Sequence, residues 1–99
     1  QMIEAGKLPI GDNLKTMVDA LVKFGNIQLE NNLPDKALEL YTQAIAIDPL
    51  NKDAYYNRGL VFLKMGKRYE ACDDLNNALT NGHPKALEPM KYSCPEFFE

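Results

Sequence analysis

The feature that most constrains this chain is an internal repeat, because shifting the sequence by 34 residues superposes identical residues without a gap. The matched residues are mostly small or apolar, which allows helices to approach one another closely. The pairs are Asp19 with Asp53, Ala20 with Ala54, Gly25 with Gly59, Leu29 with Leu63, Ala37 with Ala71, and Ala44 with Ala78. A period of this length is typical of stacked helical units. The sequence therefore predicts two consecutive units with the same fold.

Composition excludes several classes of protein. The 99 residues, 45% hydrophobic and 25% charged, suit one small globular domain. A net charge of −3 at pH 7 argues against a nucleic-acid partner, because such proteins usually carry a clear basic excess. The apolar runs are only a few residues long, so no membrane-spanning helix is expected. Two cysteines and one histidine leave little for a metal site, and no cofactor is expected.

Apolar residues at helical spacing predict two helical hairpins followed by a short fifth helix. Asp12 or Asn13 is expected to cap the first helix, Pro34 to open the second, and Gly66 to end the third. The expected helices cover about 13–31, 34–47, 52–65 and 68–80, and the fifth begins at Pro84.

Each hairpin leaves one apolar face uncovered, so the units depend on the chain ends for closure. We expect one domain over residues 1–99, comprising an N-terminal extension (1–17), a first repeat (18–51), a second repeat (52–85) and a capping segment (86–99). Gly25 and Gly59 are expected where Ala37 and Ala71 of the following helix come near. Pro89 is expected to kink the capping helix.

At these positions the sequence resembles the tetratricopeptide repeat, a helix–turn–helix unit of 34 residues. The segment Asp53-Ala-Tyr-Tyr-Asn-Arg-Gly59 resembles the first half of the opening helix of that repeat. The first unit fits the pattern at Leu21, Phe24, Gly25, Ala37, Tyr41, Ala44 and Pro49, and the second fits it at Tyr55, Gly59, Phe62, Ala71, Leu75 and Ala78. Gln28 departs from it, since an aromatic residue is usual there. The resemblance implies an all-α fold of tandem hairpins with a C-terminal capping helix.

The resemblance also implies a concave groove, formed by the first helix of each repeat, that binds a peptide or a partner protein. The implied groove residues are Val22, Lys23, Asn26, Leu29 and Glu30 from the first repeat, and Tyr56, Asn57, Leu60 and Lys64 from the second. Asparagine side chains can bond both the N–H and the C=O of an extended peptide. The alternative is that these positions are ordinary solvated helix residues.

Cys72 and Cys94 lie 22 residues apart. About ten residues out along the fourth helix and ten back along the capping helix would bring them to one end of an antiparallel pair, so a disulfide is plausible. The alternative is two unpaired cysteines. The stretch from Ala71 to Cys94 also resembles the C-terminal ends of short repeat proteins from bacterial cell envelopes. An oxidised pair would favour an oxidising compartment such as the periplasm, and a reduced pair the cytoplasm.

The expected function is non-enzymatic binding of another protein. His83, between a glycine and a proline, is typical of a turn, and Asp73 and Asp74 face different directions on one helix, so no acid–base pair is evident. One alternative is self-association into a homo-oligomer through uncovered helix faces, and another is a regulatory fragment of a larger enzyme. The tail, residues 92–99, is expected to fold back over the last helix or to enter the groove of another copy.

Overall fold

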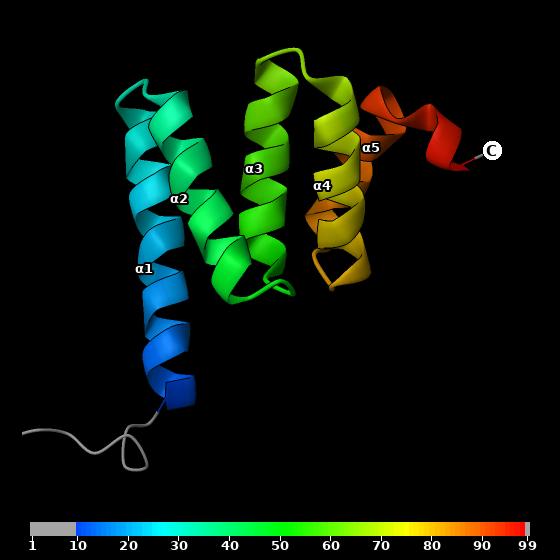
Figure 1. The fold of residues 1–99 in the computed structure, drawn as a ribbon. Helices are drawn as coiled ribbons and strands as arrows, with labels where there is room; N and C mark the ends of the chain where they lie inside the picture. Colours follow the sequence, from blue (N-terminus) through cyan, green and yellow to red (C-terminus); the bar gives the residue numbers. More distant parts are fainter. Residues whose placement is uncertain (1–9, 99) are drawn as a thin grey trace, which may run out of the picture.

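The computed structural model describes residues 10–98, and all regular structure within that range is helical. The elements are α1 (Ile10–Glu30), α2 (Pro34–Ile47), α3 (Lys52–Lys64), α4 (Arg68–Thr80), α5 (Leu87–Ser93) and two 3-10 turns, η2 (Pro84–Ala86) and η3 (Pro95–Phe98). Figure 1 shows α1 to α4 side by side in one row, with α5 at the far end beside α4; η2 and α5 pack on α4, and η3 packs on α5. The predicted tandem hairpins with a C-terminal cap are confirmed. The boundaries of the domain and its repeats stay predictions, and residues 1–9 of the expected extension lie outside the described residues.

The helix ends follow local sequence signals, with one exception. α1 begins at Ile10, so the prediction that Asp12 or Asn13 caps it was wrong. A helix that has formed gains one hydrogen bond for each added residue, which lets it extend past a possible cap. α2 opens with proline at its first position, as predicted. The Asn51 side chain caps α3 by accepting a hydrogen bond from the Ala54 N–H at 2.8 Å.

The turns that end α1 and α3 share one geometry at equivalent positions of the repeat. Asn32 and Gly66 adopt positive φ angles of 61° and 78°, in a region that is open to glycine and tolerated by asparagine. In both turns the next residue donates its N–H to the carbonyl five residues earlier, at 2.8 Å. Gly66 therefore ends α3 as predicted.

The matched glycines lie where the two helices of each hairpin approach closely. A Cβ atom built on Gly25 would lie 2.5 Å from the Tyr41 ring, and one built on Gly59 would lie 3.0 Å from Leu75. These neighbours stand one helical turn beyond the expected Ala37 and Ala71. A large side chain of the following helix thus lies nearest to each glycine, and the expected approach of Ala37 and Ala71 stays a prediction.

The C-terminal segment covers the outer side of α4. The two sides of this contact form one buried cluster, made of Cys72, Leu75 and Ala78 from α4 with Ala86, Met90 and Cys94 from the cap. Pro89 lies in the first turn of α5, where a backbone N–H would have no partner within the helix. It therefore does not interrupt α5, and the kink stays a prediction.

Candidate partner-binding face

The nine residues expected to line the groove all lie on α1 and α3, and we name them together the α1/α3 face. Four of them are exposed, namely Lys23, Asn26, Glu30 and Lys64. The other five are half-buried, namely Val22, Leu29, Tyr56, Asn57 and Leu60. The exposed members are all polar, so charged and amide groups are the most accessible groups of this face.

Two asparagines join α1 to α3 at the middle of this face. Asn57 Nδ2 donates to Asn26 Oδ1 at 3.3 Å, and the Tyr41 hydroxyl of α2 donates to the same oxygen. Burial raises the pKa of Tyr41 to about 12, so its hydroxyl keeps its proton at neutral pH. Both lone pairs of Asn26 Oδ1 are thus used, which leaves Asn26 Nδ2 as a donor and Asn57 Oδ1 as an acceptor.

The apolar members of the α1/α3 face take part in packing between helices. Val22 and Leu29 pack against the buried cluster of Ala37, Tyr41 and Val61, which joins α1, α2 and α3. Tyr56 and Leu60 pack against the cluster between α4 and the cap. Much of their surface is therefore used to position the helices, which makes the polar residues the main groups available to a partner.

Tyr56 also contacts the turn before η2. Its ring stacks on His83 with the centroids 4.1 Å apart and the planes 18° from parallel. His83 Nε2 lies 3.3 Å from the Asp53 carboxylate, which ties this turn to the start of α3. His83 Nδ1 is buried without a hydrogen-bond partner. His83 thus contacts α3 at the start of the cap. It lies in a turn, as the flanking glycine and proline predicted.

Two hollows adjoin the α1/α3 face on its N-terminal side. The smaller, of about 140 Å³, is lined by Asp19, Val22, Lys23, Asn51 and Asp53, and the larger, of about 410 Å³, by Leu14, Lys15, Val18, Asp19, Ile47, Asp48 and Asn51. Only Val22 and Lys23 were predicted as site residues. Asp19 and Asp53 are identical residues 34 positions apart, and this match in the repeat is the sequence signal that could have identified them as lining residues.

Sequence reasoning also missed an ion pair between the helices of the second hairpin. The Arg58 guanidinium of α3 binds the Asp74 carboxylate of α4, and that carboxylate is buried, whereas Asp73 is exposed. The two aspartates do face different directions, as expected. Arg58 and Asp74 are 16 residues apart, and this separation alone does not identify them as partners. Their pairing depends on how α3 and α4 align.

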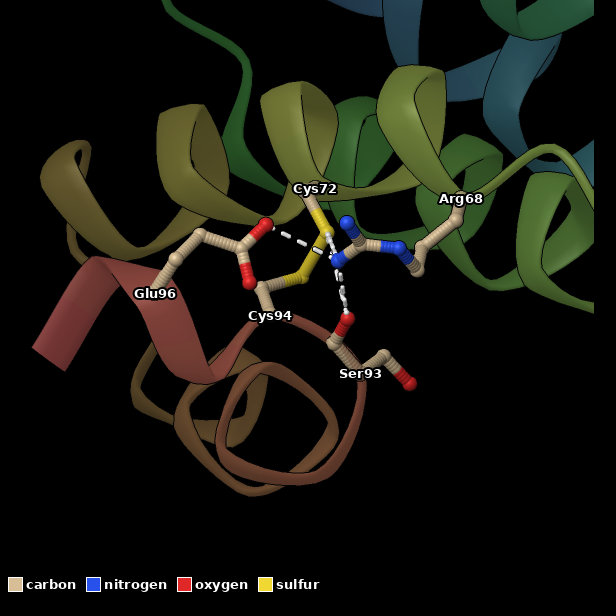
Figure 2. A network of polar contacts seen from close by, with 5 residues as sticks. All are labelled: Arg68, Cys72, Ser93, Cys94 and Glu96. Atoms are coloured by element: carbon tan, nitrogen blue, oxygen red, sulfur yellow. Dashed lines mark hydrogen bonds and ion pairs between the residues drawn. A yellow bond between two sulfur atoms is a disulfide. The ribbon is translucent and has the colours of Figure 1, made fainter.

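The cap is attached to α4 by a disulfide and a polar network (Figure 2). Cys72 and Cys94 are joined, with their Cα atoms 5.9 Å apart. Beside them, Arg68 Nη1 donates to the Ser93 carbonyl at 2.7 Å and to Glu96 Oε2 at 2.9 Å. A hydrogen bond to its own backbone, together with the Arg68 guanidinium, lowers the pKa of Glu96. These contacts hold η3 beside the start of α4.

Two further classes of site are missing from residues 10–98. That range contains no group of three or more His, Cys, Asp or Glu side chains able to hold a metal ion. None of the helices it contains is both long and apolar enough to cross a bilayer.

Comparison with known proteins finds similarity to repeat proteins. A family model described as TPR repeat matches residues 25–66, and one described as tetratricopeptide repeat matches residues 53–86. Tetratricopeptide repeat protein 36 of Caenorhabditis elegans is 41% identical over 51 residues, which are 52% of this chain and 28% of that protein. Tetratricopeptide repeat protein 6 of Homo sapiens is 36% identical over 77% of this chain and 16% of its own length.

A more distant relative is the human mitochondrial import receptor subunit TOM70, which is 28% identical over 68% of this chain and 11% of its own length. The chain thus spans less than a third of each of these three relatives.

Proposed function

Because this chain carries tandem tetratricopeptide repeats, we propose that it is a non-enzymatic protein-interaction module that binds an extended peptide segment of a partner through the α1/α3 face. The observation that carries the proposal is the amide pair of Asn26 and Asn57. This pair presents the Asn26 NH2 group of α1 as a donor and the Asn57 Oδ1 atom of α3 as an acceptor. The name of the TOM70 relative describes a receptor subunit, which agrees with a role in binding proteins.

The chemistry of the amide pair matches a peptide backbone. An extended peptide offers a C=O and an N–H that can pair with Asn26 Nδ2 and Asn57 Oδ1. Such contacts hold the main chain without reading its sequence. Lys23, Glu30 and Lys64 are exposed around the pair and carry charges of both signs, so they can select among partner side chains.

The amide pair is also held in place before a partner arrives. The Tyr41 hydroxyl and Asn57 both donate to Asn26 Oδ1, which fixes the orientation of the Asn26 amide. Side chains ordered in advance lose less conformational entropy on binding. The face therefore needs little rearrangement to receive a peptide.

The proposal is tested by selecting binders from a library of random short peptides displayed on phage, with the intact chain as bait. Selected peptides are then measured by fluorescence anisotropy against the wild type and Asn57→Ala. A single lost hydrogen bond of about 1 kcal/mol predicts roughly five-fold weaker binding by the variant. Asn57→Ala keeps the bond between Tyr41 and Asn26, so the fold is preserved.

The matched control is Asn77→Ala, since Asn77 is an exposed asparagine on α4, away from the α1/α3 face. We expect this variant to bind as the wild type does. Failure to enrich any peptide, or equal loss of affinity in both variants, would contradict binding through the amide pair.

We also propose that the protein works in an oxidising compartment. The disulfide between Cys72 and Cys94 supports this, because such bonds persist mainly where thiols are not kept reduced. The relatives named above come from animals, so the resemblance of the C-terminal end to bacterial cell-envelope proteins stays a prediction. Alkylation of free thiols in protein freshly extracted from its native cells tests the compartment, and two reactive cysteines would contradict it.

A further inference from the structure

The outer side of α1 carries a continuous apolar surface that is distinct from the α1/α3 face, and we name it the α1 stripe. Its members recur every three or four residues and so share one side of the helix. They are Leu14, Met17, Ala20, Leu21, Phe24 and Ile27, of which Ala20 and Leu21 are half-buried and Leu21 also packs against the inner cluster of Val18, Ala44 and Ala54. Leu14, Met17, Phe24 and Ile27 are between 41% and 54% exposed. The charged residues of α1 from position 13 onward, Lys15, Asp19, Lys23 and Glu30, all fall outside the stripe at helical spacing.

The equivalent positions of the second repeat indicate that the α1 stripe is a surface for packing against another helix. Ala20 and Ile27 correspond to Ala54 and Val61 of α3 at the 34-residue offset. Ala54 is 0% and Val61 is 1% exposed, because residues of α2 pack over both. Within residues 10–98, no helix covers the same positions on α1 that form a helix–helix interface on α3. A surface of this composition favours another apolar helix as its occupant.

The opposite end of the row is closed. The outer side of α4 is covered by α5, and the disulfide between Cys72 and Cys94 fastens this cover. Figure 1 shows α1 at one end of the row and α5 at the other. A second copy cannot place its α4 on the α1 stripe, so open head-to-tail stacking of copies is blocked. A contact that buries the stripe of both copies at once uses the same surface on each, which a two-fold axis provides.

The order of residues in the stripe fits such an axis. Leu14 and Ile27, Met17 and Phe24, and Ala20 and Leu21 are each equidistant from the midpoint between positions 20 and 21. We propose that two copies of this chain pair their α1 helices antiparallel through the α1 stripe. Leu14 of each copy then packs on Ile27 of the other, and Met17 on Phe24, with Ala20 and Leu21 at the axis.

The mass in solution tests whether the pair forms. Sedimentation equilibrium of the intact chain over a range of concentrations is expected to approach twice the 11.2 kDa chain mass. Phe24→Glu places a charge in each half of the contact and is expected to give the single-chain mass. Phe98→Glu is the matched control, since Phe98 is similarly exposed at the opposite end of the molecule, and should leave the pair intact.

Cross-linking tests the antiparallel register and does not depend on whether Phe24→Glu folds. Ala20→Cys lies beside the axis and is expected to link to a second copy of itself under mild oxidation. In the antiparallel pair two Leu14→Cys positions are about 20 Å apart, so this variant should not link to itself. A mixture of Leu14→Cys with Ile27→Cys should link.

Three results would overturn the proposal. A wild type at single-chain mass at every concentration would mean that some other segment or protein covers the stripe. A dimer that survives Phe24→Glu would place the contact elsewhere. Efficient linking of Leu14→Cys to itself would show a parallel arrangement. Peptide binding by the α1/α3 face is measured separately, so failure of one proposal is distinguishable from failure of the other.

Discussion

The Arg58 guanidinium holds the Asp74 carboxylate with two hydrogen bonds, from Nε at 2.7 Å and from Nη2 at 2.9 Å. Its remaining nitrogen, Nη1, donates to the Thr42 hydroxyl at 3.1 Å, so one side chain ties α2, α3 and α4 together. Burial raises the pKa of Asp74 while Arg58 opposes the rise, and the hydrogen bond to Asp74 raises the pKa of Arg58. The part-buried pair therefore joins the two helices of the second hairpin, and the exposed hydrogen bond to Thr42 adds a link to the first hairpin.

Replacing Arg58 with alanine is expected to lower the free energy of unfolding by about 3–5 kcal/mol, because it leaves the buried Asp74 without its counter-charge. Urea unfolding followed by circular dichroism measures this. The control is Asp73→Ala at the exposed neighbouring position, where a change within about 0.5 kcal/mol is expected. Equal effects of the two substitutions would show that the pair does not join the helices.

Reduction of the disulfide is expected to destabilise the protein by about 3 kcal/mol, because the bond between Cys72 and Cys94 closes a loop of 22 residues in the unfolded chain. Thermal unfolding with and without a reductant measures the change. A variant with alanine at both positions should have a melting temperature that the reductant does not alter. If the wild type were equally insensitive once its thiols were shown to be free, the cap would not depend on the bond.

Gly25→Ala is expected to destabilise the protein by about 1–3 kcal/mol, because its new methyl group would overlap the Tyr41 ring. That ring cannot swing aside easily, since its hydroxyl is bonded to Asn26. Gly59→Ala is the comparison, where the nearest side-chain atom lies 3.0 Å away and belongs to Leu75. Chemical denaturation should give the larger loss for Gly25→Ala, and the reverse order would contradict the close approach of α1 and α2.

Alkaline pH is expected to weaken the fold through Tyr41. Its pKa is raised to about 12 from 10.0, so the folded state favours the neutral phenol. The stabilisation is complete below pH 10.0 and is lost as the pH rises toward 12. The free energy of unfolding should fall less steeply with pH over this window for Tyr41→Phe than for the wild type. At neutral pH this variant should be less stable by about 1 kcal/mol, because it lacks the hydrogen bond of the hydroxyl.

Tyr92→Phe provides the control, since Tyr92 is 83% exposed on α5. This variant should follow the wild type across the whole pH range. An identical alkaline profile for Tyr41→Phe and the wild type would show that the Tyr41 hydroxyl has no such effect.

Much of the fold follows from patterns that are local in the sequence. The 34-residue offset, the proline that opens α2 and Gly66 each act within one helix or turn, and the structure agrees with them. The predicted start of α1 was wrong because a single cap residue competes weakly with extension of the helix. The side chains nearest to Gly25 and Gly59, Tyr41 and Leu75, were not predicted, because they depend on how two helices align.

The chemistry of the α1/α3 face was less predictable for the same reason. Asn26 and Asn57 were placed on one face by the repeat, but their mutual hydrogen bond and the bond from Tyr41 require three helices in register. The pairing of Arg58 with Asp74 depends likewise on the alignment of α3 with α4. Sequence periodicity indicates which side of a helix a residue occupies, and it does not indicate which atom of another helix lies opposite.

The central claim, that the amide pair of Asn26 and Asn57 receives a peptide backbone, is tested most directly by nuclear magnetic resonance of the side-chain NH2 groups. A peptide selected from the random library is titrated into the labelled wild type. The NH2 signals of Asn26 and Asn57 are expected to shift together with backbone signals of α1 and α3, while that of Asn77 stays in place. Saturable binding that leaves the Asn26 and Asn57 signals unchanged would contradict the account.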